Sequence, residues 1–195
     1  KINKKDLESV EKCEFADFNT EDIKTCEVSK IQTQNHLDMQ KMLGKWYGVA
    51  TLKYTATSFG HSGLLNIYMD SDILKIKYTS SIKGQCLPPV VATLRPDGTN
   101  IGSYTTEALG QSSVLKVTYL DDNYAVIYQC DKMNIYGNCH HSSTYVNILS
   151  REDNIDDATF KTLADKLIPL CIPPGDLLQT EHDGNYVTTR SDDIL

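Results

Sequence analysis

The sequence has little of what marks the common classes of membrane, nucleic-acid-binding and catalytic protein. It contains no apolar run of the ~18 residues that a membrane-spanning helix needs. Its Lys and Arg residues form no marked cluster and the formal net charge is −7, which argues against a nucleic-acid partner. No Gly-x-Ser-x-Gly, His-Glu-x-x-His, P-loop or Gly-x-Gly-x-x-Gly motif occurs. We therefore expect a protein that is not an enzyme and requires no cofactor.

The six cysteines are even in number and include no Cys-x-x-Cys pair. This pattern favours three disulfides and a secreted, extracellular protein over a zinc site. The chain begins at Lys1 without methionine, which fits a mature product after removal of a signal peptide, although a chain cut there for another reason would begin in the same way. Asn-x-Ser/Thr sequons are absent, so N-glycosylation is not expected.

The five histidines do not indicate a metal or haem site. His140 and His141 lie beside Cys139, but no acid or third ligand follows at a suitable spacing. His61 could offer an axial haem ligand, yet nothing around it reproduces a haem site. We therefore predict no bound metal.

Short runs rich in β-branched and aromatic residues predict an all-β domain. Gly, Asp, Asn and Ser separate these runs. Eight strands joined mostly by tight turns favour a closed antiparallel up-and-down barrel, since closure removes exposed sheet edges. The predicted strands are 45–54, 64–70, 73–80, 88–95, 100–107, 112–120, 123–131 and 143–150.

One α-helix is expected after the eighth strand. Its apolar residues recur at helical spacing, acidic residues precede them, and Pro169 is expected to end the helix. Such a stripe suits a helix packed on the outside of a barrel; its members are Phe160, Leu163, Ala164, Leu167 and Ile168. A short helical turn is expected over 36–43, before the first strand.

We expect three parts in the chain. Residues 1–34 form a charged N-terminal extension held by disulfides more than by packing. Residues 35–171 form the barrel and its helix. Residues 172–195 form a polar tail that wraps the surface or frays.

Three segments together resemble the motifs of the lipocalins. The first is Asn-x-x-Asp-x-x-x-x-x-Gly-x-Trp-Tyr over 35–47, which contains the single tryptophan. Residues 120–130 resemble the second motif, although Tyr-Leu-Asp at 119–121 replaces its usual Thr-Asp-Tyr start, and 145–151 resemble the third. The resemblance implies that Trp46 plugs the closed end of an eight-stranded barrel and that Arg151 lies over its ring in a cation–π contact. The open end would admit a small apolar ligand.

The cysteine layout and the C-terminal half further resemble the plasma retinol-binding proteins. This resemblance implies the pairs Cys26–Cys171 and Cys130–Cys139. It leaves Cys13 and Cys86, which we expect to pair with each other. Residues 57–60 and 86–89, expected at the mouth, lack a bulky apolar cluster, so arthropod lipocalins with polar pockets and bilin carriers remain alternatives.

Alternate residues of a barrel strand point inward, which predicts the ligand-binding residues. Lys75 and Lys77 should face water, and the other residues of their strand should then face the cavity. The excess of 11 tyrosines over four phenylalanines indicates a pocket that offers hydroxyl groups. The expected ligand-binding residues are Phe59 as a lid, Asn66, Tyr68, Leu74, Ile76, Tyr78, Val114, Ala125, Ile127, Tyr145, Asn147 and Leu149.

These features predict a secreted carrier or sequestering protein for one small hydrophobic molecule, such as a retinoid, bilin, carotenoid or lipid. A pigment or lipid would then be its bound ligand. The alternative is a salivary or defence inhibitor whose loops bind a protein receptor, protease or carrier partner. No nucleic acid or membrane span is expected in either case.

Overall fold

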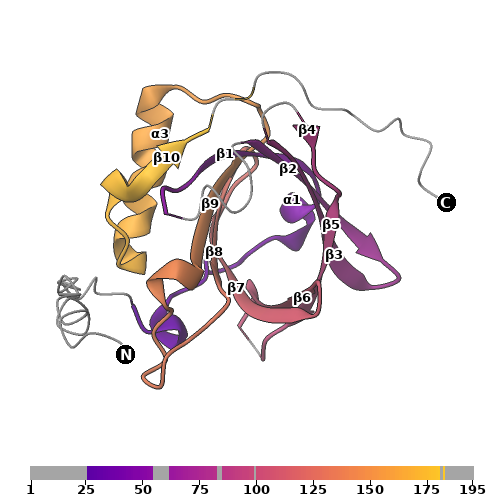
Figure 1. The fold of residues 1–195 in the computed structure, drawn as a ribbon, viewed down its shortest axis with the longest axis vertical. Coiled ribbons are helices and arrows are strands. Elements are labelled where there is room, and N and C mark those ends of the chain that lie inside the picture. The colour runs from indigo at the N-terminus through magenta and orange to yellow at the C-terminus, as the bar shows by residue number, and fades with distance from the viewer. Residues whose placement is uncertain (1–25, 55–61, 83–84, 99, 181, 183–195) are drawn as a thin grey trace, which may run out of the picture.

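The computed structural model describes residues 26–54, 62–82, 85–98, 100–180 and 182. Their main feature is an antiparallel sheet closed into an up-and-down barrel (Figure 1). Each barrel strand pairs with the next along the chain, and the last pairs with the first, which closes the barrel. The eight-stranded barrel predicted from the sequence is confirmed. Its strands are β1 Gly44–Leu52, β2 Ser62–Asp70, β3 Ile73–Ile82, β5 Val90–Pro96, β6 Ser103–Ala108, β7 Gln111–Leu120, β8 Tyr124–Cys130 and β9 Thr144–Ser150.

Two short strands extend this sheet. β4, Gln85–Cys86, pairs with the end of β3, and β10, Leu177–Gln179, pairs with β1. β10 is a difference from the expected surface tail, because part of that tail adds a strand to the sheet. A 3-10 helix, Pro174–Asp176, leads into β10, and the side chain of Gln179 donates a hydrogen bond to the Ile155 carbonyl at 3.2 Å.

Helical segments lie before and after the barrel. Helix α1, Met39–Met42, begins after Asp38, whose carboxylate accepts the Gln40 N–H at 3.0 Å. Helix α3, Asp157–Ala164, begins after Asp156, which accepts the Thr159 N–H at 2.7 Å. Both are N-caps that satisfy amide groups of the first turn. Figure 1 shows α3 outside the barrel, as predicted.

Two expected details of the C-terminal helix are wrong. The α-helix ends at Ala164 and continues as a 3-10 helix over Asp165–Leu170, so Pro169 lies inside a helical segment and does not end it. A 3-10 helix has three residues per turn, which brings Leu167 and Leu170 to the buried side. Ile168 therefore leaves the predicted stripe and is 61% exposed.

Apolar residues pack in two layers, one inside the barrel and one outside it. The inner layer includes Trp46, Ile67 and Val117. The outer layer lies where α3 and the segment after Cys26 cover β8 and β9, and it includes Val126 and Leu167. β8 contributes to both layers because its successive side chains point to opposite faces.

Two disulfides hold the flanking segments to the barrel. Cys26 is bonded to Cys171 and Cys130 to Cys139, with Cα–Cα distances of 5.3 and 5.7 Å, so both pairings expected from the resemblance are confirmed. Cys86 is exposed and bonded to no other described cysteine. Its expected partner, Cys13, lies outside the described residues, and that pairing stays a prediction, as does the division into three parts.

The described part of the N-terminal segment also makes polar contacts with β7. Lys116 is only 5% exposed, and its ammonium group donates to the Ile31 carbonyl at 2.9 Å. The Gln34 side chain accepts the Leu120 N–H and donates to the Leu120 carbonyl. The described part of this segment therefore packs on the barrel, in addition to its covalent link.

Candidate functional site: the barrel cavity

One end of the barrel interior is filled around Trp46. The indole is fully buried, and its Nε1 donates to the Met42 carbonyl at 2.8 Å, which links β1 to α1. Met42 is itself fully buried, and Leu37 packs in the same inner layer. α1 and the residues before it therefore close this end of the barrel.

Arg151, just after β9, covers the Trp46 ring. Its guanidinium carbon lies 3.6 Å from the ring centroid, so the cation–π contact implied by the resemblance is present. The same guanidinium donates to the carbonyls of Lys41, Leu43 and Lys45 at 2.6, 3.0 and 2.7 Å. Burial lowers the pKa of Arg151, which nevertheless remains charged at neutral pH.

Gly44 makes this close approach possible. Its φ is +98°, a left-handed conformation that favours glycine, and a Cβ there would lie 3.3 Å from an Arg151 guanidinium nitrogen. In the Gly-x-Trp motif, Gly44 therefore supplies the turn and leaves space for Arg151, and Trp46 supplies the ring that Arg151 covers.

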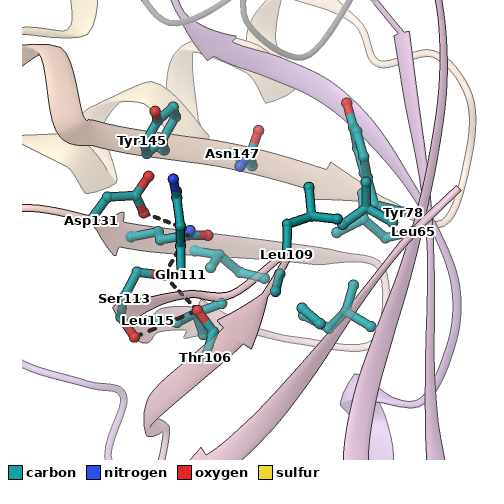
Figure 2. Close-up of a pocket in the computed structure, with 16 residues that line it drawn as sticks. Leu65, Tyr78, Thr106, Leu109, Gln111, Ser113, Leu115, Asp131, Tyr145 and Asn147 are labelled. Carbon is teal, nitrogen blue, oxygen red and sulfur yellow. Dashed lines mark hydrogen bonds between the residues drawn. The ribbon is translucent and has the colours of Figure 1, made fainter. Parts of the chain in front are cut away.

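The other half of the barrel interior contains a cavity of about 280 Å³ (Figure 2). Its walls include residues at the ends of β6 and β8 and at the starts of β5, β7 and β9, so it lies at the end opposite Trp46. Most of the lining is apolar. The lining residues are Leu65, Ile76, Tyr78, Val90, Ala92, Thr106, Ala108, Leu109, Gln111, Ser113, Leu115, Ile127, Gln129, Asp131, Tyr145 and Asn147.

Polar groups of the cavity are connected along one wall. The hydroxyls of Thr106 and Ser113 lie 2.5 Å apart, and Gln129 Nε2 donates to Ser113 Oγ and to Asp131 Oδ1, both at 3.0 Å. Burial raises the pKa of Tyr145, and the neighbouring Asp131 carboxylate raises it further, so the phenol is neutral at physiological pH. This wall offers both donors and acceptors at fixed positions.

Tyr78 lies across the cavity from this polar wall (Figure 2). Burial raises the pKa of its hydroxyl to about 12, a shift that the hydrogen bond with Ser80 partly offsets. The ring leans over Gly63 on β2, where an added Cβ would come within 2.5 Å of ring and hydroxyl atoms. Gly63 therefore sets the position of the Tyr78 ring.

Leu109 lies between these walls at the turn that joins β6 to β7. It has a φ of +52°, rare for a bulky residue, and the following Gly110 has a φ of +76°. Ala108 pairs with Gln111, so this is a two-residue hairpin turn whose positive φ values match the twist of the strands. The turn presents Leu109, 85% exposed, as an apolar group at the mouth.

The structure sorts the expected ligand-binding residues into four groups. Ile76, Tyr78, Ile127, Tyr145 and Asn147 line the cavity. Leu74, Ala125 and Leu149 also point inward, but they pack in the layer around Trp46 and not in the cavity lining. Asn66, Tyr68 and Val114 point away from the interior, and Phe59 lies outside the described residues. Ligand binding by any of them stays a prediction.

The inward orientation expected for Asn66 and Tyr68 is wrong, because Leu65 and Ile67 are the residues of β2 that face the interior. A two-residue turn, Ser71 and Asp72, pairs Ile67 with Ile76 across the hairpin. Opposite residues of an antiparallel pair share a face, so an inward Ile76 requires an inward Ile67. The Asp-Ser-Asp sequence at 70–72 indicates this two-residue turn, and the turn fixes which residues of β2 and β3 are paired.

The inward orientation expected for Val114 is wrong for a similar reason. Val114 lies two residues from Lys116 and therefore on the same face of β7, which points outward beneath the N-terminal segment. Its neighbours Ser113 and Leu115 line the cavity. Lysines of a barrel strand are expected to point away from the cavity. This rule, applied to Lys116, places Val114 on the outward face as well.

Eleven lining residues were not predicted. Gln129 and Asp131 alternate with the predicted Ile127, so strand periodicity could have found them. Most of the others belong to β5, β6 and β7, where the sequence has no clear alternation of apolar and polar residues. The missed residues are Leu65, Val90, Ala92, Thr106, Ala108, Leu109, Gln111, Ser113, Leu115, Gln129 and Asp131.

The described residues contain no group of three or more His, Cys, Asp or Glu side chains arranged to hold a metal. His140 is exposed, and His141 stacks on Tyr54 with ring centroids 3.6 Å apart. His61 lies outside the described residues. No helix in the described part of the chain is long and apolar enough to cross a membrane.

Solved structures share this arrangement of strands and helix. Lobster apocrustacyanin A1 matches with 18% identity and a TM-score of 0.61, over 74% of this chain and 79% of that one. Insecticyanin from the tobacco hornworm Manduca sexta matches with 18% identity and a TM-score of 0.62, over 78% of this chain and 84% of that one. Apocrustacyanin C2 matches with 19% identity and a TM-score of 0.61, over 75% and 81% of the two chains.

No family model matches the chain, and no curated protein matches it. Identities below 20% establish the fold and nothing finer. The chain has the lipocalin fold, as the three sequence motifs indicated. The closer resemblance to the plasma retinol-binding proteins rests on the cysteine layout and the C-terminal half of the sequence, and it stays a prediction.

Proposed function

We propose that this chain is an extracellular carrier or sequestering protein that binds one small, largely apolar molecule in its barrel. The observation that carries the proposal is a cavity with mostly apolar walls in one half of a barrel whose other half is filled around Trp46. Burial of apolar ligand surface supplies roughly 25 cal/mol per Å², and the few polar groups of the lining fix orientation. Two disulfides support an oxidising compartment.

The size of the cavity limits the classes of ligand that fit within it. Its volume of about 280 Å³ lies just below the ~300–1,000 Å³ of typical ligand sites. A compact molecule or a medium-length chain fits between the described walls. A bilin or a carotenoid has a larger volume, and would project from the mouth beyond these walls.

Binding, and not catalysis, is the activity that the lining suits. The described lining residues include no Cys, His, Lys or Arg. They therefore offer no thiol nucleophile, no imidazole base and no cation to stabilise a developing negative charge.

Displacement of a fluorescent lipid probe tests this function. We expect saturable 1:1 binding of the probe and its displacement by at least one of a panel of retinoids, bilins and medium-chain lipids. Ala92→Phe should weaken binding because Ala92 lines the cavity. Val91→Phe is the matched control, since Val91 is 44% exposed and points outward from the same strand. Absence of probe binding, or equal loss in both variants, would contradict the proposal.

One observation favours the alternative, a protein-binding function through a loop. The loop between Cys130 and Cys139 exposes Met133, Ile135 and Tyr136, which are 47%, 92% and 75% exposed. Its shape is fixed by Asn134 Oδ1, which accepts the Tyr136 and Asn138 N–H groups at 2.9 and 3.1 Å. A rigid loop with exposed apolar side chains is typical of a protein contact.

Ile135→Ser combined with Tyr136→Ser tests this alternative. The double variant should retain ligand binding if the cavity is the functional site, since neither residue lines it. If the double variant no longer binds a protein partner but keeps its ligand affinity, the loop is the functional site. Ile101→Ser, on a different exposed turn, serves as the control.

A further inference from the structure

The polar groups of the cavity include a single carboxylate. Among the described residues that line it, Asp131 is the only Asp, Glu, Lys, Arg or His, and burial raises the pKa of the two lining tyrosines above its ordinary value. Two basic residues lie near it along the chain, Lys132 and His140, but both are exposed and neither lines the cavity. The cavity therefore has a negative polar end and no described cation within its walls.

The Asp131 carboxylate has a defined position. Its backbone follows the disulfide-bonded Cys130, and its N–H donates to the Ser143 carbonyl at 3.0 Å. Gln129 Nε2 donates to one carboxylate oxygen at 3.0 Å. The Tyr145 hydroxyl also hydrogen-bonds this carboxylate. A carboxylate accepts several hydrogen bonds at its two oxygens, so a ligand donor can bind it together with Gln129 and Tyr145.

The opposite side of the cavity is suited to an apolar group. Figure 2 shows Asp131, Gln111 and Tyr145 together at one end, with Leu65 and Tyr78 at the other. Leu65 and Ile76 are almost fully buried and line the cavity from the neighbouring strands β2 and β3. A bound molecule that satisfies both ends has one polar end and one apolar end.

We propose, on the basis of the ligand-binding function above, that the cavity selects amphiphiles whose polar end is a protonated amine and discriminates against those that end in a carboxylate. An ammonium group at Asp131 forms a charge-assisted hydrogen bond in a partly desolvated site. A carboxylate in the same place faces Asp131 and loses its hydration without gaining a cation. An alcohol, which donates a hydrogen bond without charge, ranks between them.

Three probes with the same apolar chain and different polar groups isolate the contribution of the polar group to the affinity. n-Decylamine, n-decanol and decanoic acid are titrated into the disulfide-intact protein at neutral pH by calorimetry. We expect the amine to bind most tightly and the acid most weakly, with at least about a tenfold difference between amine and acid. The advantage of the amine over the alcohol should fall as salt is added, because salt screens a partly exposed ion pair.

Asp131→Asn tests whether this carboxylate is the source of the preference. The change keeps the shape and the oxygen that accepts from Gln129 while removing the charge. Amine affinity should fall about tenfold, acid affinity should rise, and decanol affinity should stay constant, which also shows that the cavity is intact. Asp122→Asn is the matched control, because Asp122 is exposed and paired with Lys41 at the opposite end of the barrel.

The outcomes separate this inference from the function on which it depends. Equal affinity for amine and acid, with decanol bound, overturns the charge preference and leaves the carrier function standing. A preference that persists in Asp131→Asn overturns the role of Asp131. Failure of all three probes, together with failure of the retinoid and bilin panel, overturns the carrier function itself.

Discussion

Arg151 joins the end of β9 to the closed end of the barrel through the face of Trp46. The 3.6 Å separation of guanidinium carbon and ring centroid is accompanied by hydrogen bonds to three carbonyls between residues 41 and 45. One side chain therefore hydrogen-bonds the backbone of α1, of the residue that follows it and of the start of β1. The contact stabilises the floor of the cavity and lies away from the cavity itself.

Replacing Arg151 by Ala should lower the free energy of unfolding by about 1–3 kcal/mol, because the cation–π contact and the packing of the stem are lost. Ligand affinity should change much less. Urea denaturation provides the measurement, and Arg95→Ala is the control, since Arg95 forms an exposed pair with Glu107. Equal stability of the two variants would show that the Trp46 contact adds nothing.

Trp46 should fluoresce at short wavelength and resist quenching by iodide. The indole is fully buried, and it is the only tryptophan, so the signal has one source. The same protein in denaturant, where the ring meets water, gives the reference quenching constant. Efficient quenching of the folded protein would be incompatible with a sealed floor.

Gly63→Ala should displace the Tyr78 ring and weaken ligand binding, because the new Cβ would occupy the space of the ring edge. In a Tyr78→Ala background the same change should have little effect, since the clashing atoms are gone. A double-mutant cycle on probe affinity measures this coupling. Independent, additive effects of the two changes would argue that Gly63 does not position the ring.

Asp121 should contribute stability that depends on pH. Burial raises its pKa, but hydrogen bonds from the Tyr119 hydroxyl and from the Tyr124 and Asn123 N–H groups lower it more, so the folded pKa is below the ordinary 3.8. The folded state therefore binds fewer protons than the unfolded state near that pH. The stabilisation is complete above the ordinary pKa and is lost as the pH falls through the folded value.

Asp121→Asn should accordingly cost roughly 1–2 kcal/mol at neutral pH and progressively less in acid. Urea denaturation across the pH range measures the difference from wild type, with Asp122→Asn as the control for a neighbouring, exposed carboxylate. A difference that stays constant down to strongly acidic pH would indicate that the charge of Asp121 is not the cause.

Peptide mapping without reduction should yield Cys26 with Cys171 and Cys130 with Cys139, and also Cys13 with Cys86. Opening the first bridge by Cys26→Ser and Cys171→Ser should lower stability by about 2–4 kcal/mol, since it closes a loop of 145 residues. Cys13→Ser leaves both bridges of the described residues intact, so a loss of stability in that variant measures the predicted third pair. A free thiol at Cys86 in the native protein would disprove the third pairing.

The sequence determined the eight barrel strands, their order and the barrel floor, but not the short strands β4 and β10. Each strand is a local run with its own turn signals, and Trp46 and Arg151 make the contact that the resemblance implied. Two disulfide pairings also followed from the resemblance. The strands depend on local residue patterns, and the disulfides were expected from the resemblance in cysteine spacing. Both can be identified without coordinates.

The cavity lining was decided by tertiary structure. Whether a residue faces inward depends on strand register, and a shift of one residue reverses every side chain, as Asn66 and Tyr68 show. The outer faces of β7 and β8 are covered by the N-terminal segment and α3, so the outward Val126 and Tyr128 are as buried as the inward Ile127. Burial of both faces removes the alternation of apolar and polar residues from which direction could have been predicted, and only the closed barrel shows which face holds the cavity.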